Sequence, residues 1–68
     1  MTSHNPPPPT RIRMARQQAG MTQAQAAQTV SVSQSTWKRW ESGRHRMPPA
    51  MMDMFTIVTG LRVAGAGR

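Results

Sequence analysis

Apolar positions recur every three or four residues in several segments of the chain, and glycine or proline separates the segments. Ile12 and Ala15 fall on one face of residues 11–19, which is the spacing of an amphipathic helix. Thr10 is the expected N-cap of this helix, and Gly20 is its expected C-terminal stop.

Two shorter helices are expected to follow. Thr22 caps an alanine-rich run over 22–29, and Ser33 caps a run over 33–42 that ends at Gly43. Two short helices joined by about four turn residues are the skeleton of a helix-turn-helix.

A fourth helix is expected over 50–59, after a proline pair that the start of a helix tolerates. Four apolar residues at i, i+3, i+4 and i+7 share one face of this helix: Met51, Met54, Phe55 and Val58. We interpret the stripe as core, with a ligand-binding surface as the alternative and a dimer contact over part of it.

The two ends of the chain differ from this pattern. Residues 1–10 hold four consecutive prolines, which favour extended backbone, and we expect a disordered leader there. Residues 61–68 are short and punctuated by glycine, and we expect a frayed tail. The predicted domain is therefore 11–60, a small all-α fold of four to five helices.

The two tryptophans of the chain, Trp37 and Trp40, lie one helical turn apart. They share a side with Val30 and Ala27, whereas polar and basic residues occupy the opposite side. Aromatic residues that stack on bases usually belong to open sheet surfaces, and no strand pattern is present. The tryptophans are therefore expected in the core rather than on nucleic acid.

Charge narrows the choice of partner. Nine Lys and Arg residues against two acids give a net charge of +7, which indicates a polyanion, nucleic acid before membrane. A basic surface without a partner is the alternative. With two carboxylates no acid–base pair can be proposed, and no cysteine is available for a disulfide or a thiolate zinc site. We expect no enzyme activity, no cofactor, no metal and no small-molecule ligand.

The chain also lacks the signals of a membrane or secreted protein. No run approaches the ~18 apolar residues of a membrane span, and the first ten residues lack the basic and apolar regions of a secretory signal. The expected location is the cytoplasm.

The polar face of the third segment suits duplex DNA. Gln34 can make paired hydrogen bonds to adenine and Arg39 to guanine in the major groove. Ser35 can serve either base, and Lys38 can reach a guanine or a phosphate. The alternative for each is solvated surface.

Residues 21–43 resemble the helix-turn-helix of the Cro/C1-type, or xenobiotic-response-element, regulators of bacteria and phages. An apolar-Thr-Gln start, a central alanine, a Val-Ser entry and a Trp-Glu-x-Gly exit stand at matching spacings: Met21-Thr22-Gln23, Ala27, Val32-Ser33 and Trp40-Glu41-Ser42-Gly43. The resemblance implies a λ-repressor-like fold and binding to double-stranded DNA.

The resemblance also implies roles for single residues. The base-reading positions are Gln34, Ser35, Lys38 and Arg39. The phosphate-contacting positions are Gln23, Ser33, Ser42, Arg44 and Arg46, and Gln23 also supports the recognition helix. Arg16 and Glu41 match a structural ion pair.

Three departures from the family pattern are visible. Ser31 replaces the turn glycine, at a cost of about 1 kcal/mol if it is left-handed. Ala15 and Ala26 replace larger aliphatic residues, and Trp37 is expected to fill the vacated volume. A fifth helix, which often carries the dimer contact in relatives, is absent or vestigial.

The resulting hypothesis is a sequence-specific regulator, a homodimer on an inverted repeat that represses its own operon. The segment MPPAMMDMFTIVTG also resembles the compact autorepressors found beside phage anti-CRISPR genes. The alternatives are an antitoxin whose methionine-rich fourth helix masks a toxin, and an RNA-binding protein.

Overall fold

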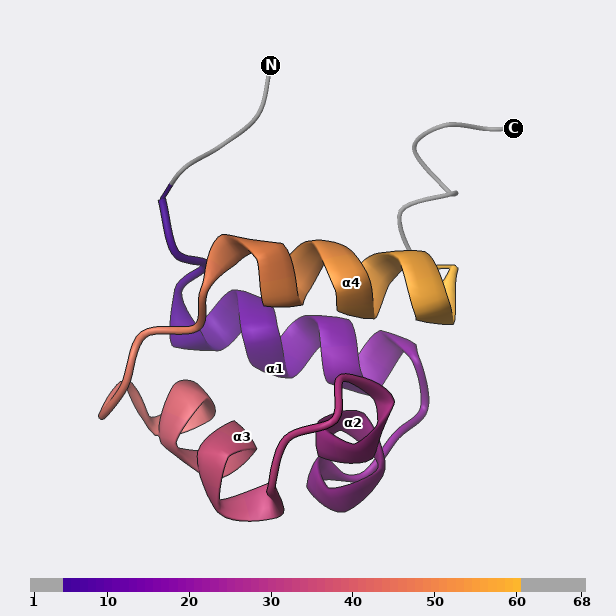
Figure 1. Cartoon of the computed structure of the whole chain (residues 1–68), viewed down its shortest axis with the longest axis horizontal. Helices are drawn as coiled ribbons and strands as arrows, with labels where there is room; N and C mark the ends of the chain where they lie inside the picture. Colours follow the sequence, from indigo (N-terminus) through magenta and orange to yellow (C-terminus); the bar gives the residue numbers. More distant parts are fainter. Residues whose placement is uncertain (1–4, 61–68) are drawn as a thin grey trace.

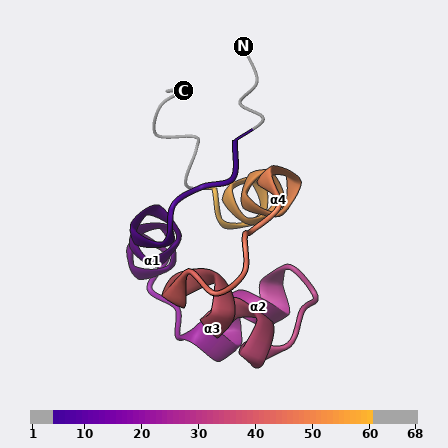
Figure 2. The same cartoon turned by 90° about the vertical axis from the view of Figure 1, so that its left-hand side faces the viewer.

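The computed structural model describes residues 5–60, and within them the chain forms four helices and no strand: α1 (Pro9–Gln18), α2 (Gln23–Thr29), α3 (Gln34–Ser42) and α4 (Pro49–Thr59). α1 and α4 run in the same direction on one side of the domain, and α2 and α3 form the other side (Figures 1 and 2). α3 packs on both α1 and α2, and α2 also contacts α4. The predicted all-α helix-turn-helix fold is confirmed.

Both helices of the helix-turn-helix begin at the predicted caps. The Thr22 hydroxyl accepts a hydrogen bond from the Gln25 backbone N–H at 3.1 Å, and the Gln25 side chain accepts one from the Thr22 N–H at 2.9 Å. The Ser33 hydroxyl accepts a bond from the Thr36 N–H at 3.1 Å. These bonds satisfy N–H groups that a helix start leaves without a partner. Gly43, left-handed at φ 84°, ends α3.

The start of α1 differs from the prediction. Thr10 is not the N-cap; Pro8 holds that position, and Pro9 is the first helical residue. Proline fits there because the first turn has no use for its missing N–H and its φ is already helical. Two residues of the predicted leader thus belong to α1, while residues 1–4 of the leader and all of the tail lie outside the described residues.

The turn between α2 and α3 contains a left-handed serine. Ser31 has φ 61° and is the non-glycine residue of positive φ within residues 5–60. An L-residue in this conformation costs about 1–2 kcal/mol. The backbone N–H groups of Val30 and Val32 both bond to the Ala27 carbonyl, at 3.2 and 2.9 Å, and close the turn around it.

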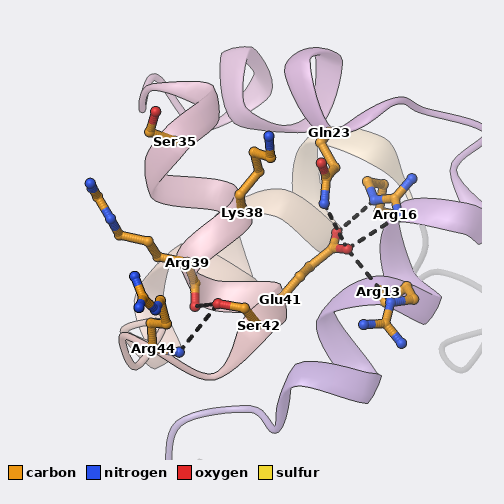
Figure 3. A pocket seen from close by; sticks show the side chains of 9 residues that line it. All are labelled: Arg13, Arg16, Gln23, Ser35, Lys38, Arg39, Glu41, Ser42 and Arg44. Atoms are coloured by element: carbon orange, nitrogen blue, oxygen red, sulfur yellow. Dashed lines mark hydrogen bonds and ion pairs between the residues drawn. The ribbon is translucent and has the colours of Figure 1, made fainter.

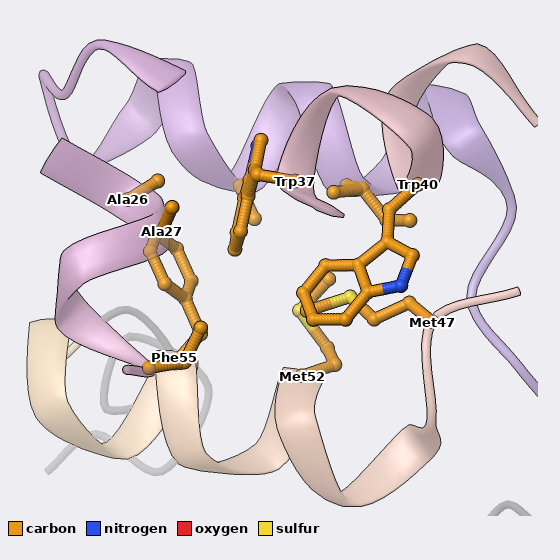
Figure 4. Close-up of a cluster of buried hydrophobic side chains, with 10 residues drawn as sticks. Ala26, Ala27, Trp37, Trp40, Met47, Met52 and Phe55 are labelled. Carbon is orange, nitrogen blue, oxygen red and sulfur yellow. The ribbon is translucent and has the colours of Figure 1, made fainter. Parts of the chain in front are cut away.

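Trp37 lies at the centre of the core, as predicted (Figure 4). It is 0% exposed, and its ring centre lies 5.6 Å from that of Trp40 and 5.2 Å from that of Phe55. Ala26 and Ala27 of α2 are buried in the same cluster. The small side chains of α2 thus leave room in this cluster for the large indole ring of Trp37.

The predicted core stripe of α4 is wrong in part. Phe55 is buried, but Met54 and Val58 are 44% and 60% exposed. Met52 is buried instead, and Met47, which lies between α3 and α4, is 0% exposed and lies near Trp40 (Figure 4). Because Trp37 and Met47 fill much of the interior, α4 buries only a narrow face. Among residues 5–60, the large apolar side chains that are exposed are Met14, Met54, Ile57 and Val58.

No helix of residues 5–60 combines the length and the apolar character that a membrane span requires.

Replacing Trp37 with alanine should unfold the domain. Removing a buried tryptophan costs about 3–5 kcal/mol, which is close to all that the core of such a small domain supplies. Circular dichroism should show loss of helix at 25 °C. The helix content of Trp37→Phe should lie between those of Trp37→Ala and the wild type. A folded Trp37→Ala variant that has only lost DNA binding would contradict the packing role.

Candidate nucleic-acid interface

One face of the domain is a shallow open groove of about 550 Å³, to which three helices and the segment after α3 contribute. Figure 3 shows the side chains that line it: Arg13, Arg16, Gln23, Ser35, Lys38, Arg39, Glu41, Ser42 and Arg44. The exposed residues of α3 in this set follow the spacing i, i+3, i+4, i+7, so they form one stripe of the helix. The buried tryptophans occupy the other side of α3, and their packing turns the stripe outward.

Glu41 is a buried acid at the edge of the groove, with a side chain 4% exposed. Its Oε2 accepts hydrogen bonds from Arg16 Nε at 2.6 Å and from Trp37 Nε1 at 2.5 Å. Its Oε1 accepts bonds from Arg16 Nη2 and Gln23 Nε2, both at 3.2 Å. These four bonds satisfy the lone pairs of the carboxylate, and they connect α3 to both α1 and α2.

The pKa of Glu41 reflects two opposing effects. Burial by itself would raise the pKa of this carboxyl. The hydrogen bonds that it accepts, led by those from Arg16, and the positive charge of Arg16 outweigh burial, so the pKa lies below its ordinary value. The carboxylate is therefore ionised at neutral pH.

Arg16 is the main partner of Glu41 and is itself mostly buried, with a side chain 17% exposed. Besides its two bonds to Glu41, its Nη1 donates to the Met21 carbonyl at 3.1 Å. The hydrogen bond to Glu41 raises the pKa of Arg16 against the opposing effect of burial. Arg16 thus clamps α1 to α3 and to the segment that leads into α2.

The structure gathers six of the nine predicted DNA-contacting residues in the groove: Gln23, Ser35, Lys38, Arg39, Ser42 and Arg44. Ser33, Gln34 and Arg46 are exposed but do not line it. Ser33 and Gln34 instead mark the N-terminal end of α3. The Ser42 hydroxyl already donates to the Arg39 carbonyl at 3.1 Å and accepts from the Arg44 N–H at 3.4 Å.

Arg13 is a groove residue that the sequence analysis did not single out. Its Nε lies 3.7 Å from Glu41 Oε1, and its side chain is 49% exposed. It precedes Arg16 by three residues, a spacing that places two side chains on the same face of a helix. This spacing is the feature of the sequence that could have indicated Arg13 as a groove residue.

The charges of the groove favour an anionic ligand. Lys38, Arg39 and Arg44 carry no ion pair among residues 5–60, and the one groove acid, Glu41, already pairs with Arg16. No three His, Cys, Asp or Glu side chains are grouped for a metal ion in the described part of the chain. The groove can therefore hold phosphates by charge and present serine, lysine and arginine donors to base edges.

The stability of the domain should fall in acid because of Glu41. Its pKa is lower in the folded state than the ordinary 4.5 of the unfolded chain, so its contribution is complete above that value and disappears as pH falls through the folded pKa. Urea unfolding between about pH 7 and pH 3 should show a constant free energy at first and a decline below about pH 4.5.

Two variants test this assignment. Glu41→Gln should lose about 3 kcal/mol at pH 7, because it leaves Arg16 without its counter-charge, and should remove most of the decline in acid. Asp53→Asn, at the exposed second acid, should retain the decline. An unchanged acid profile in Glu41→Gln would show that another group causes the loss.

Comparison with known proteins agrees with this geometry. Residues 10–68 match a family model described as a helix-turn-helix domain. The Type II methyltransferase M.MspI from Moraxella sp is 40% identical over 42 residues, which make up 62% of this chain and 10% of that protein. The chain thus spans no more than a small part of this relative's length. The capped helices, the turn between them and a match that covers most of the sequence show that the chain belongs to the helix-turn-helix domain family.

Proposed function

We propose that this protein is a sequence-specific regulator of the Cro/C1 type that binds double-stranded DNA. The observation that carries the proposal is the outward stripe of α3, where Ser35, Lys38 and Arg39 lie in a basic groove. In helix-turn-helix proteins the second helix of the motif enters the major groove. α3 is that helix here, and its polar stripe faces away from the core.

The base contacts are assigned to this stripe and to the start of α3. Arg39 suits guanine, and Gln34 suits adenine at the N-terminal end of the helix, from which recognition helices reach base edges. Ser35 and Lys38 complete the reading set. Outside this set, the residues proposed to contact phosphates are Gln23, Ser33, Ser42, Arg44 and Arg46.

A homodimer on an inverted repeat is the proposed binding form. Two half-sites about 34 Å apart would let both recognition helices enter the same face of the duplex. The exposed apolar residues of α4, Met54, Ile57 and Val58, support self-association, because a domain this small gains stability by covering them. A bound dimer would block a promoter in the cytoplasm, most simply that of its own operon, as in the phage autorepressors that the sequence resembles.

Methyl transfer is not part of the function proposed for this chain. The match to the Type II methyltransferase comprises 42 residues, 10% of that protein. A match of this extent gives no support for methyl transfer by this chain.

Arg39→Ala should weaken binding to the cognate site by about 1–3 kcal/mol, about 5- to 150-fold. Fluorescence anisotropy on duplexes tiled across the DNA upstream of the gene, with a scrambled duplex and two salt concentrations, measures this loss. Arg11→Ala is the matched control, because Arg11 is exposed on α1 and does not line the groove.

The pattern of binding decides the proposal. Tight binding to a site with an inverted repeat, lost in Arg39→Ala and retained in Arg11→Ala, supports base reading by α3. Equal, salt-sensitive binding to every duplex contradicts sequence reading. Tighter binding to RNA contradicts groove entry, since a helix cannot enter the narrow major groove of A-form RNA.

Ile57→Asp should convert the dimer to a monomer in analytical ultracentrifugation and reduce operator affinity, because it places a charge in an apolar contact. Met14→Asp is the control, at a residue of similar exposure on α1. An unchanged dimer in Ile57→Asp would exclude α4 as the contact. Copurification of a second protein with the wild type but not with Ile57→Asp would favour the antitoxin alternative.

A further inference from the structure

We propose that Arg13 of α1 is a DNA-contacting residue that binds a backbone phosphate beside the recognition helix. The inference rests on the proposed function and assigns a contact outside the helix-turn-helix. Two observations support it: Arg13 lines the groove, and the nearby carboxylate of Glu41 already accepts all the hydrogen bonds that it can.

Glu41 has no hydrogen-bonding capacity left for Arg13. A carboxylate offers about four acceptor positions, and Arg16, Trp37 and Gln23 together supply four donors to it. The Arg13 Nε lies 3.7 Å from Oε1, which is beyond hydrogen-bond distance. Arg13 is thus near Glu41 without being one of its hydrogen-bond partners.

Charge leads to the same conclusion. Arg16 neutralises Glu41 at 2.6 Å, so the charge of Arg13 is in excess at this edge of the groove. The Arg13 side chain is 49% exposed and remains hydrated, whereas Glu41 is buried and already paired with Arg16, so the longer contact with Arg13 adds little to that pair. Moving the guanidinium from Glu41 to a phosphate would therefore cost little.

The surroundings of Arg13 suit a phosphate. Figure 3 shows Arg13 on α1 at one side of the groove, with Lys38 and Arg39 on α3 at the other. A guanidinium can donate two parallel hydrogen bonds to a phosphate, which a lysine cannot do. With the α3 stripe in the major groove, α1 would hold Arg13 against the flanking backbone.

The experiment compares Arg13→Gln with Arg11→Gln in the full chain. Both variants remove one positive charge from the exposed surface of α1, but Arg11 does not line the groove. Anisotropy titrations on the selected operator duplex and on a scrambled duplex, between about 50 and 200 mM salt, give the dependence of affinity on salt.

Arg13→Gln should make the slope of log K against log salt shallower by about 0.9, the value for one phosphate contact. Affinity should fall about eightfold near 0.1 M salt, equally for both duplexes, because phosphates carry no sequence information. Arg11→Gln should change the slope by much less. Thermal unfolding midpoints of the two variants should agree, since Glu41 keeps all four of its hydrogen bonds.

Each other outcome overturns the assignment. Equal effects of the two variants would mean that only net charge matters. A loss confined to the operator would indicate a base contact, and a lower unfolding midpoint in Arg13→Gln alone would indicate a structural role. In these cases wild-type binding to the operator still supports the proposed function, whereas a wild type that binds no duplex would remove both proposals.

Discussion

The buried carboxylate of Glu41 is the group on which the arrangement of α1, α2 and α3 depends. A charge removed from water is costly unless it is paired and hydrogen-bonded, and here two bonds from Arg16, one from Trp37 and one from Gln23 meet that requirement. These donors come from all three helices. The carboxylate can be buried at low cost only when the helices are correctly placed, so it selects their relative position.

Trp37 joins this polar network to the apolar core. Its indole ring packs between Trp40 and Phe55, and its Nε1 donates to Glu41. The same side chain therefore fills the centre of the domain and fixes the acid at the edge of the groove. No buried side-chain nitrogen or oxygen atom in residues 5–60 lacks a partner, which is what a single well-defined packing requires.

Neutralising the one groove acid internally has a consequence for binding. Lys38, Arg39 and Arg44 face the groove without an ion pair among the described residues. Their charge is available to a polyanion, and the pair between Arg16 and Glu41 connects α1 to α3 beneath them. The arginine that pairs with Glu41 is thus distinct from the arginines proposed to contact DNA on the same surface.

Local sequence patterns were sufficient to predict the two helices of the motif and to distinguish the buried face of α3 from its exposed face. Thr22, Ser33 and Gly43 act through bonds or backbone angles within a few residues, and the spacing of Trp37 and Trp40 assigns one side of α3 to the core. The pairing of Arg16 with Glu41 was anticipated from family resemblance. The assignments of bases and phosphates to single side chains remain predictions.

Other features depended on how the helices meet in space. α4 is apolar on more than one face, so the spacing of its apolar residues could not distinguish the buried Met52 from the exposed Met54 and Val58. The burial of Met47 and the place of Arg13 in the groove likewise follow from contacts between segments far apart in the chain. The sequence by itself determined where the motif helices begin and end, because capping is local. Only the tertiary structure decided which side chains share the core and the groove, because that depends on helix packing.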